Sequence, residues 1–439
     1  SGGEAYEGLS NAGEMGTNLI IVVNDNEMSI AENHGGLYQN LKELRDTEGR
    51  SSCNFFRSLG LDYLYVGEGN DIPSLVAAFA KVKDTSRPTV VHIHTQKGKG
   101  YAPAEADREE FHWEMPFDLE TGKPKVDCSG MEDYHSLTGK FLLEKMKEDH
   151  TVVAISSGTP TVIGFTPERR KQAGRQFVDV GIAEEHAVAL ASGIAAGGGR
   201  PVYGVYSTFI QRCYDQLSQD LCINGNPAVI TVFMGTVAGM NDVTHLGFFD
   251  IPLISNIPNM VYLAPTCSEE YFAMLEWAVR QTEYPVAIRV PGVAVVHRKE
   301  EFDTDYSELN RYKMTARGET VAILALGSFY DLGQALKNKL REESGVEATL
   351  INPRYITGLD ELMLEELKVG HRIVVTLEDG VLDGGFGEKI ARYYGNSEMR
   401  VLNYGLRKEF ADRYNLDELM KANRLTDKQM AEDIAGILE

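Results

Sequence analysis

The chain has 439 residues and a formal net charge of −22 at pH 7, with 65 acidic and 43 basic side chains. This length exceeds what one hydrophobic core normally serves, so two or three domains are expected. The acidic balance argues against nucleic acid and anionic membranes as partners, and no apolar run approaches the roughly 20 residues of a membrane span. The five cysteines are scattered without a Cys-x-x-Cys pair, which fits the reducing cytoplasm rather than a disulfide framework or structural zinc site.

The first predicted domain covers residues 1–115 and alternates strands with helices. Residues 24–30 (Asn-Asp-Asn-Glu-Met-Ser-Ile) follow its first strand, and 97–101 (Lys-Gly-Lys-Gly-Tyr) follow its last. The first run either makes a turn or offers oxygen ligands that Mg²⁺ prefers. The second is a solvated turn or a loop whose N–H groups and ammonium favour a phosphate. The predicted elements are helices at 5–14 and 72–83 and strands at 18–23, 63–66 and 89–95.

The second predicted domain covers residues 130–296, after a linker at 114–131 rich in Pro, Gly, Lys and Asp. Glu184, Glu185 and His186 stand at a strand-to-helix corner in this domain. Open α/β sheets bind ligands outside the carboxyl ends of their strands, although two acids at a helix start also simply favour its dipole. The predicted elements are strands at 151–156, 177–182, 202–206, 228–233, 260–264 and 285–290, helices at 134–146 and 187–196, and a polar loop at 241–247.

The third predicted domain covers residues 315–439, after a polar linker at 297–317. It repeats the alternation of strands and helices but carries no chemical constellation, so structure or dimerisation is its favoured role. The predicted fold class is therefore α/β, with three consecutive domains that each hold a mostly parallel sheet with helices on both faces. The predicted elements are strands at 320–326, 348–351, 372–377 and 401–404 and helices at 330–343, 360–367 and 387–394.

Five segments together resemble the 1-deoxy-D-xylulose-5-phosphate synthase family, which belongs to the transketolase group of thiamine diphosphate enzymes. Each segment alone is weak, but the set is specific, and the order of the three domains also matches. The resemblance implies a transketolase-like fold and a cytoplasmic homodimer without nucleic acid or membrane partners. The segments are 24–30, 97–101, 182–187 (Ile-Ala-Glu-Glu-His-Ala), 206–212 (Tyr-Ser-Thr-Phe-Ile-Gln-Arg) and 244–247 (Thr-His-Leu-Gly).

The resemblance implies a site for thiamine diphosphate and Mg²⁺. Glu184 resembles the glutamate that hydrogen-bonds the aminopyrimidine ring of the cofactor, and Phe209 resembles the aromatic residue that stacks on that ring. The side chain of Asn26 and the carbonyl of Met28 resemble metal ligands, and Lys97 resembles a contact to the diphosphate. The implied cofactor contacts are Asn26, Met28, Ser29, Lys97, Ile182, Glu184 and Phe209.

The resemblance also implies the reaction, a step of isoprenoid and thiamine biosynthesis. Pyruvate loses carbon dioxide, and its remaining two-carbon unit joins glyceraldehyde 3-phosphate to give 1-deoxy-D-xylulose 5-phosphate. His112 and His245 resemble histidines that handle the carboxylate, hydroxyl or carbonyl of the substrates, so the implied catalytic residues are these two and Glu184. The implied substrate contacts are Tyr206, Arg212, Asn241, Asp242 and Arg289.

The chain departs from the family pattern at the cofactor motif. The Gly-Asp-Gly that begins this motif, and whose Asp is a further metal ligand, has no counterpart from Ser1 onward. Because the remaining half of the motif is intact, we expect the missing half to lie in a segment before Ser1. The loop-like composition of residues 48–51 fits either a real loop or the place of an omitted segment.

Further departures lie at the acceptor end. Met234 stands where the family has an Arg, and the run Arg289-Val290-Pro291-Gly292 lacks a second one. These arginines resemble a clamp on the acceptor phosphate, and each hydrogen bond to a charged group is worth roughly 1.5–3 kcal/mol. Asn241-Asp242 also replaces the usual Asp-Gly. Because the cofactor end is preserved, these changes indicate an altered acceptor rather than an inactive enzyme.

Three hypotheses follow from the sequence. The leading one is a thiamine diphosphate-dependent transferase of the synthase type described above. The second is a transketolase-like enzyme with a different donor or a non-phosphorylated aldehyde acceptor. The third is a non-catalytic homologue that binds a partner, which intact cofactor binding by the full-length polypeptide would contradict.

Overall fold

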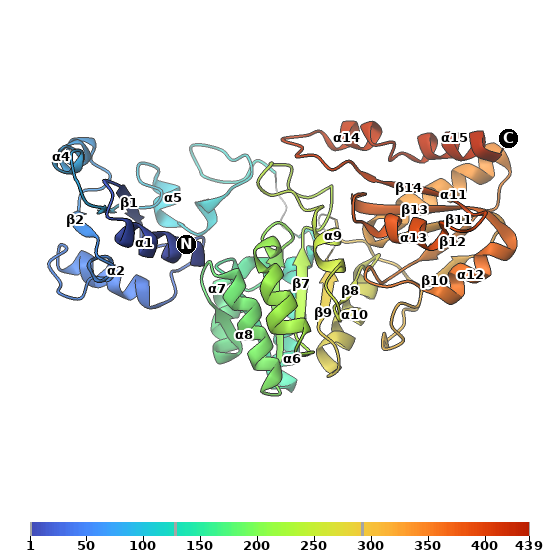
Figure 1. The fold of residues 1–439 in the computed structure, drawn as a ribbon, viewed down its shortest axis with the longest axis horizontal. Coiled ribbons are helices and arrows are strands. Elements are labelled where there is room, and N and C mark those ends of the chain that lie inside the picture. Colours follow the sequence, from blue (N-terminus) through green and yellow to red (C-terminus); the bar gives the residue numbers. More distant parts are fainter. Residues whose placement is uncertain (1, 127–129, 291–293, 439) are drawn as a thin grey trace. The chain divides into compact units, whose positions relative to one another are not determined.

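The structure is a computed structural model that describes residues 2–126, 130–290 and 294–438. It divides into two compact units, which Figure 1 draws in blue to cyan and in green to red. The first unit comprises residues 1–131 with the short segments 157–160 and 179–183, and the second comprises the remainder. Each unit is described by itself.

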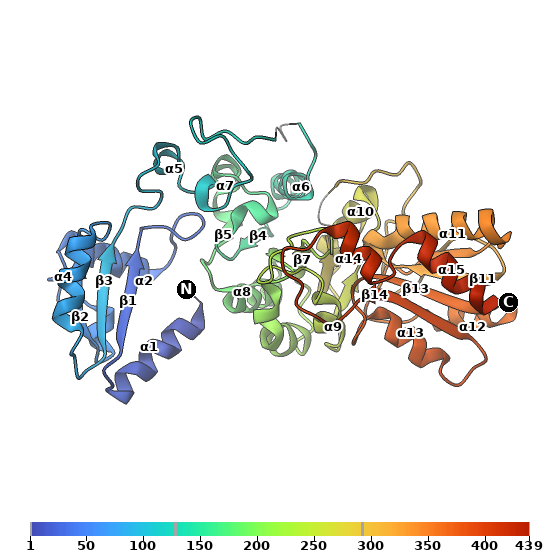
Figure 2. The same ribbon diagram turned by 90° about the horizontal axis from the view of Figure 1, so that it is seen from above.

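The first unit is built on a three-stranded parallel sheet in the order β1-β3-β2. Successive side chains of a strand point to opposite faces, and the central strand follows this rule. Val90 packs with Leu44 and Phe56 on one face, whereas Val91 packs with Ala78 on the other. The elements are β1 (Ile20–Asp25), β2 (Asp62–Val66), β3 (Thr89–His94), α1 (Gly3–Met15), α2 (Gly36–Asp46), α3 (Phe55–Ser58), α4 (Ile72–Val82), α5 (Ala102–Ala106) and the 3₁₀ turn η1 (Glu110–His112). Figure 2 shows α4 and α2 on either side of this sheet.

The second unit contains a six-stranded sheet in the order β5-β4-β6-β7-β9-β8. Its strands from β4 to β8 pair in parallel, as the alternation of strands and helices predicted. The strands are β4 (Val152–Ser156), β5 (Phe177–Asp179), β6 (Arg200–Tyr206), β7 (Val229–Phe233), β8 (Val261–Leu263) and β9 (Val286–Arg289). The helices are α6 (Tyr134–Glu148), α7 (Pro167–Ala173), α8 (Glu184–Ala196), α9 (Asp250–Ser255) and α10 (Ser268–Arg280), with the short helices η2 (Pro160–Ile163), η3 (Gly174–Gln176), η4 (Ile210–Cys213) and η5 (Gln216–Cys222).

The sequence placed both boundaries of the corner before α8 three residues later than the structure has them. The strand predicted at 177–182 ends at Asp179, and α8 begins at Glu184 rather than at 187. Gly181 has a φ of 73°, a left-handed conformation that glycine adopts without strain and that breaks the strand. Glu184 and Glu185 therefore lie in the first helical turn, where acidic side chains favour the helix dipole.

A third sheet, also in the second unit, has the order β10-β12-β11-β13-β14. All its pairs are parallel except β10 with β12, which is antiparallel. The strand β10 corrects the sequence analysis, which assigned these residues to a linker. The elements are β10 (Lys313–Ala316), β11 (Thr320–Ala325), β12 (Thr349–Asn352), β13 (His371–Val381), β14 (Arg400–Leu406), η6 (Gly327–Phe329), α11 (Tyr330–Ser344), α12 (Glu361–Gly370), α13 (Phe386–Tyr394), α14 (Leu416–Ala422) and α15 (Asp427–Leu438).

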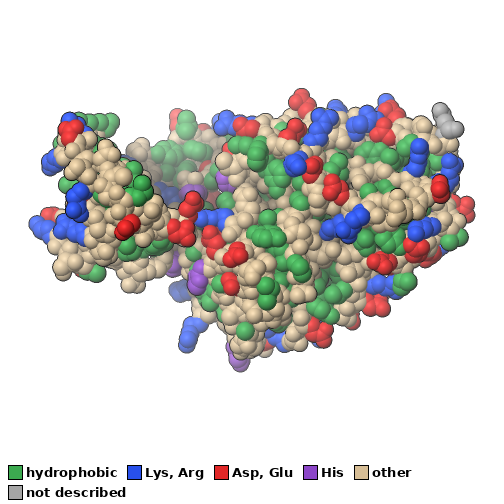
Figure 3. All heavy atoms as spheres, in the orientation of Figure 1, with side chains coloured by type: hydrophobic (Ala, Val, Ile, Leu, Met, Phe, Trp, Pro, Cys, Tyr) green, Lys and Arg blue, Asp and Glu red, His purple; other side chains and the backbone are tan. Residues whose placement is uncertain are grey.

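The predicted fold class is confirmed, because each sheet is mostly parallel and flanked by helices. Among the described residues, no helix is both long and apolar enough to span a membrane. Acidic and basic side chains are interspersed over the face drawn in Figure 3, despite the net charge of −22.

Candidate active site

The polar run after β1 folds into a tight turn in the first unit. The side-chain oxygen of Asn26 accepts a hydrogen bond from the N–H of Met28 at 3.0 Å, and Asp25 accepts one from the N–H of Glu27 at 3.1 Å. Glu27 has a φ of 68°, in the left-handed region. This turn brings the amide oxygen of Asn26 to the backbone N–H of Met28.

A buried polar network holds Asp25, the residue at the start of this turn. Asp25 is 4% exposed, and its carboxylate binds the guanidinium of Arg45 and the Nε2 atom of His92 at 3.0 Å. The Tyr63 hydroxyl lies 2.6 Å from the other ring nitrogen of His92. Burial alone would raise the pKa of Asp25, but the hydrogen bonds from His92 and Arg45 outweigh it and hold the pKa at about 2. Asp25 is therefore ionised at neutral pH.

The basic loop after β3 reaches the same turn. The Nζ atom of Lys97 donates to the carbonyl oxygens of Ser29 at 2.9 Å and Ile30 at 3.3 Å, and it lies 3.2 Å from Nδ1 of His112. Burial lowers the pKa of Lys97. Burial and then the charge of Lys97 lower the pKa of His112, so its ring is neutral at pH 7. The structure thus brings together the predicted contacts of the first unit.

The donor set of this turn suits a hard cation in part. An amide oxygen and a backbone carbonyl are ligands that Mg²⁺ accepts, and this ion also keeps phosphate and water ligands. Among the described residues, His, Cys, Asp and Glu side chains form no cluster of three that suits a metal. A cation at Asn26 and Met28 therefore needs further oxygen ligands from a bound diphosphate.

In the second unit, Glu184 is buried at the start of α8. It is 3% exposed, and its Oε2 atom lies 3.2 Å from Nη1 of Arg212, whose Nε atom lies 3.7 Å from Glu185. Burial raises the pKa of Glu184, and its own backbone N–H and the charge of Arg212 oppose this shift. The corner therefore holds a buried carboxyl group whose protonation is sensitive to the charge of Arg212.

Three rings gather close to this corner. Tyr206 ends β6, and Phe209 directly precedes η4, which packs against α8. The ring of Phe209 lies 5.8 Å from that of Tyr206 and 5.6 Å, edge to face, from that of His245. Burial raises the pKa of Tyr206. The structure therefore brings the predicted stacking residue beside one predicted catalytic histidine.

His245 is oriented by the turn that precedes it. Its Nδ1 atom lies 2.7 Å from the Thr244 hydroxyl and 3.6 Å from Oδ1 of Asp242. The same carboxylate accepts from the Thr244 N–H at 2.8 Å. Asp242, predicted to bind substrate, thus contacts the turn that orients the histidine, and these contacts leave the Nε2 atom of His245 outside them.

Two other predicted substrate contacts point toward the third sheet. The Asn241 side chain donates to the carbonyl of Tyr414 at 3.1 Å. Arg289 is 5% exposed and forms an ion pair with Asp250 at 2.7 Å, while its Nη2 also donates to the carbonyl of Asp379. The guanidinium of Arg289 is therefore engaged by buried partners in this structure, and its role as a substrate contact stays a prediction.

The acceptor departures are placed only in part. Met234 follows β7 with a φ of 56°, and its side chain packs against the core of the six-stranded sheet. Pro291 and Gly292 lie outside the described residues. Ile182 belongs to the first unit, in the segment 179–183.

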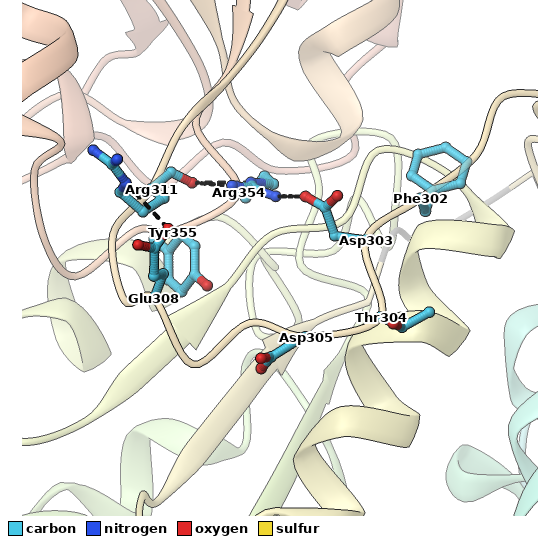
Figure 4. Close-up of a pocket in the computed structure, with 8 residues that line it drawn as sticks. All are labelled: Phe302, Asp303, Thr304, Asp305, Glu308, Arg311, Arg354 and Tyr355. Carbon is cyan, nitrogen blue, oxygen red and sulfur yellow. Dashed lines mark hydrogen bonds and ion pairs between the residues drawn. The ribbon is translucent and has the colours of Figure 1, made fainter.

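A pocket of 510 Å³ in the second unit lies away from these residues (Figure 4). It is lined mainly by the segment after the second domain, with acidic Asp303 and Asp305 at its edge. Arg354 pairs with Asp303 and donates to the carbonyl of Arg311. These contacts attach the segment to the third sheet. The pocket is therefore a space formed where the segment packs against Arg354 and Tyr355.

Comparisons with known proteins agree with this arrangement. The family model "Transketolase, pyrimidine binding domain" matches residues 132–295, "Transketolase, C-terminal domain" matches 311–430, and "1-deoxy-D-xylulose-5-phosphate synthase" matches 1–54. Among solved structures, a transketolase from Pichia stipitis in complex with sedoheptulose 7-phosphate has a TM-score of 0.58 and 15% identity over 99% of this chain and 74% of its own. A split-gene transketolase, described as an inactive β4 tetramer, has a TM-score of 0.59 and 21% identity over 69% of this chain and 96% of its own. These similarities show the fold.

Curated relatives are closer. The 1-deoxy-D-xylulose-5-phosphate synthase of Lachnoclostridium phytofermentans is 33% identical over 98% of this chain and 75% of its own length. The enzyme of the same name from Clostridium tetani is 33% identical over 100% of this chain and 76% of its own. The chain therefore spans about three quarters of these relatives. It belongs to the 1-deoxy-D-xylulose-5-phosphate synthase family of thiamine diphosphate-dependent transferases.

Proposed function

We propose that this chain condenses pyruvate with glyceraldehyde 3-phosphate, with loss of carbon dioxide, to form 1-deoxy-D-xylulose 5-phosphate. Family membership supports the reaction class. The observation that carries the proposal is the buried carboxyl group of Glu184 at the start of α8, with Phe209 and His245 gathered at the neighbouring turn. The proposed reaction needs a carboxyl group shielded from water, an aromatic face and a hydrogen-bond donor, and these three residues supply them.

Thiamine diphosphate supplies the carbanion chemistry when it is bound. Glu184 would hold the ring nitrogen of its aminopyrimidine through a hydrogen bond, which a low-dielectric pocket strengthens. The raised pKa of Glu184 brings the carboxyl closer to the protonated form that donates such a bond. Phe209 would offer its face to the same ring.

The turn of the first unit would hold the diphosphate and a magnesium ion. Asn26 and the carbonyl of Met28 supply oxygen ligands, and Ser29 and Ile182 complete the proposed cofactor contacts. The ammonium group of Lys97 supplies a positive charge. In this structure it donates hydrogen bonds to two backbone carbonyls. An ammonium group with a pKa lowered by burial gains most from an anionic partner, since the partner restores the charged form.

The substrate would be held by two histidines and an arginine. His112, which lies beside Lys97 and has a lowered pKa, and His245, which is oriented by Asp242, would contact the carboxylate, hydroxyl or carbonyl of the substrates. Arg212 offers its remaining N–H groups to a carboxylate or hydroxyl. Tyr206 lines the same region beside Phe209.

A second candidate differs only in the acceptor. Met234 replaces an expected cation, and Arg289 is engaged with Asp250 and Asp379. Both observations favour a non-phosphorylated aldehyde, because a phosphate left without cationic partners pays a large desolvation cost.

The two candidates are separated by supplying the full-length polypeptide with Mg²⁺, thiamine diphosphate and pyruvate. Glyceraldehyde 3-phosphate and glyceraldehyde are then compared as acceptors, with products identified by mass spectrometry. Formation of the phosphorylated pentulose supports the first candidate, and a product only from glyceraldehyde supports the second. No product with either acceptor, despite cofactor binding, would sink both.

We also propose a cytoplasmic homodimer for the intact protein, as the family resemblance implies. Light scattering at micromolar concentration tests the dimer. A monomeric mass under those conditions would contradict it.

A further inference from the structure

The loop of residues 234–247, called here the His245 loop, is bonded to the third sheet by side chains and backbone alike. This loop follows β7 and ends in the turn that orients His245. Its partners are Asp379 at the end of β13 and the segment 412–414 before α14, which lie more than 130 residues further along the chain. Figures 1 and 2 both show the segment before α14 beside the loops that follow β7.

Asp379 fixes the beginning of the loop. It is 1% exposed, and its Oδ1 atom accepts a hydrogen bond from the N–H of Val237 at 2.7 Å. The Ser328 hydroxyl donates to its other oxygen at 2.6 Å, and Arg289 donates to its backbone carbonyl. Because Ser328 lies in η6 and Arg289 lies in β9, these two partners hold Asp379 in place against the loop.

Tyr414 holds the same stretch from the other side. Its hydroxyl donates to the carbonyl of Val237 at 2.6 Å and lies 3.4 Å from that of Met240. Burial and then Asp379 raise the pKa of Tyr414 to about 12. The hydroxyl therefore keeps its proton, and remains a donor, throughout the physiological range.

The backbone of the segment continues this contact toward His245. The N–H of Arg413 donates to the carbonyl of Asn241 at 2.6 Å, and the Asn241 side chain returns a bond to the carbonyl of Tyr414. The carboxylate of Asp412 accepts from the N–H of Val243 at 3.2 Å. Val243 is two residues from His245, so a shift of the loop here moves the imidazole directly.

We propose that Asp379, Asp412 and Tyr414 act as positioning residues that set the place of His245 from the third sheet. The third domain, for which the sequence indicated no chemistry, thereby controls the substrate end of the site. The role of His245 rests on the proposed function. The hydrogen bonds of Asp379, Asp412 and Tyr414 to the His245 loop, called here the clamp, do not depend on that function.

Hydrogen–deuterium exchange of the full-length polypeptide without added ligands tests the clamp. Tyr414→Phe removes one hydroxyl, and Asp412→Ala removes one exposed carboxylate whose loss leaves the core intact. Either change should raise exchange of the peptide covering 236–245 by about three- to tenfold, the factor that one hydrogen bond corresponds to. The matched control is Tyr394→Phe, which removes a tyrosine hydroxyl bonded to the carbonyl of Leu364 within the same domain. Unchanged exchange in both loop variants would overturn the clamp.

Kinetics then test the positioning role. Tyr414→Phe should lower kcat/KM for the aldehyde acceptor by about the same factor, while thiamine diphosphate affinity stays near that of Tyr394→Phe. Looser exchange with an unchanged kcat/KM for the acceptor would overturn the positioning role. If the unmodified protein shows no turnover, the proposed function fails, whereas the exchange experiment still decides whether the clamp exists.

Discussion

The Nη1 atom of Arg212 lies 3.2 Å from the Oε2 atom of Glu184, so one ion pair joins a proposed substrate contact to a proposed cofactor contact. Glu184 is buried, whereas Arg212 is about one third exposed. The charge of Arg212 therefore reaches the carboxyl through a medium that screens it only in part. A change at Arg212 should affect the protonation of Glu184 as well as the substrate.

Replacement of Arg212 by Met should move the limb of the kcat profile that reports Glu184 to higher pH. Removing the cation takes away one of the effects that oppose burial, so the pKa of Glu184 rises further and its carboxyl group keeps its proton to a higher pH. The profile of kcat against pH measures this shift. Arg212→Lys, which keeps the charge, serves as the control, and an unmoved limb in the Met variant would show that the pair does not set the titration of Glu184.

Asp25→Asn should destabilise the first unit at neutral pH and less so in acid. The folded pKa of about 2 lies below the unfolded value of about 3.9, so this carboxylate contributes stability above the unfolded pKa and loses it as pH falls through the folded one. The shift corresponds to about 2.6 kcal/mol near pH 7. Hydrogen exchange of the β3 amides at about pH 7 and about pH 2.5 measures the gap between variant and parent.

The control for Asp25 is Asp46→Asn, since Asp46 pairs only with exposed Lys42 in the same unit. Its exchange should match that of the parent at both pH values. An equal effect of the two substitutions would mean that the network with Arg45 and His92 contributes no more than a surface pair.

Arg289→Met should lower the free energy of unfolding of the second unit by about 3–5 kcal/mol, because it leaves the carboxylate of Asp250 buried without its partner. Urea unfolding followed by fluorescence of Trp277, in α10, measures the loss. The double variant Arg289→Met/Asp250→Leu should recover part of it, since both charges are then gone. If Arg289→Met has normal stability but a raised KM for the acceptor, the result would instead support Arg289 as a substrate contact.

Met234→Arg should favour a phosphorylated acceptor. A new hydrogen bond between charged groups is worth roughly 1.5–3 kcal/mol, so the ratio of kcat/KM for glyceraldehyde 3-phosphate over glyceraldehyde should rise about 10- to 150-fold. Met234→Gln shares the strained backbone at φ 56° but adds no charge, which makes it the matched control. An equal ratio in the two variants would show that this position does not face the acceptor.

The sequence predicted the parts of the fold that local pattern determines. Apolar β-branched runs located the strands other than β10 to within a few residues, and the corner before α8 was found because two acids stand between an apolar run and a helix. Strand β10 was missed, because Lys313–Ala316 is short and mixed in polarity and pairs only through its antiparallel contact with β12.

The positions that local pattern could not reveal are those set by contacts between distant segments. Asp379 lies inside a strand that was predicted to end at residue 377, and Tyr414 stands in a loop without a motif. Their bonds to Val237 join residues 142 and 177 positions apart. The buried pair of Arg289 with Asp250 was likewise invisible, so resemblance alone assigned Arg289 to the substrate.

The most direct test of the account compares carbon dioxide release from pyruvate by the full-length protein and its Glu184→Gln variant. Both are saturated with thiamine diphosphate and Mg²⁺, with cofactor binding measured separately by titration. The account predicts that the variant still binds the cofactor but releases carbon dioxide slower by orders of magnitude, because the amide cannot exchange the carboxyl proton. Near-equal rates in the two proteins would contradict the assignment of Glu184 and, with it, the proposed site.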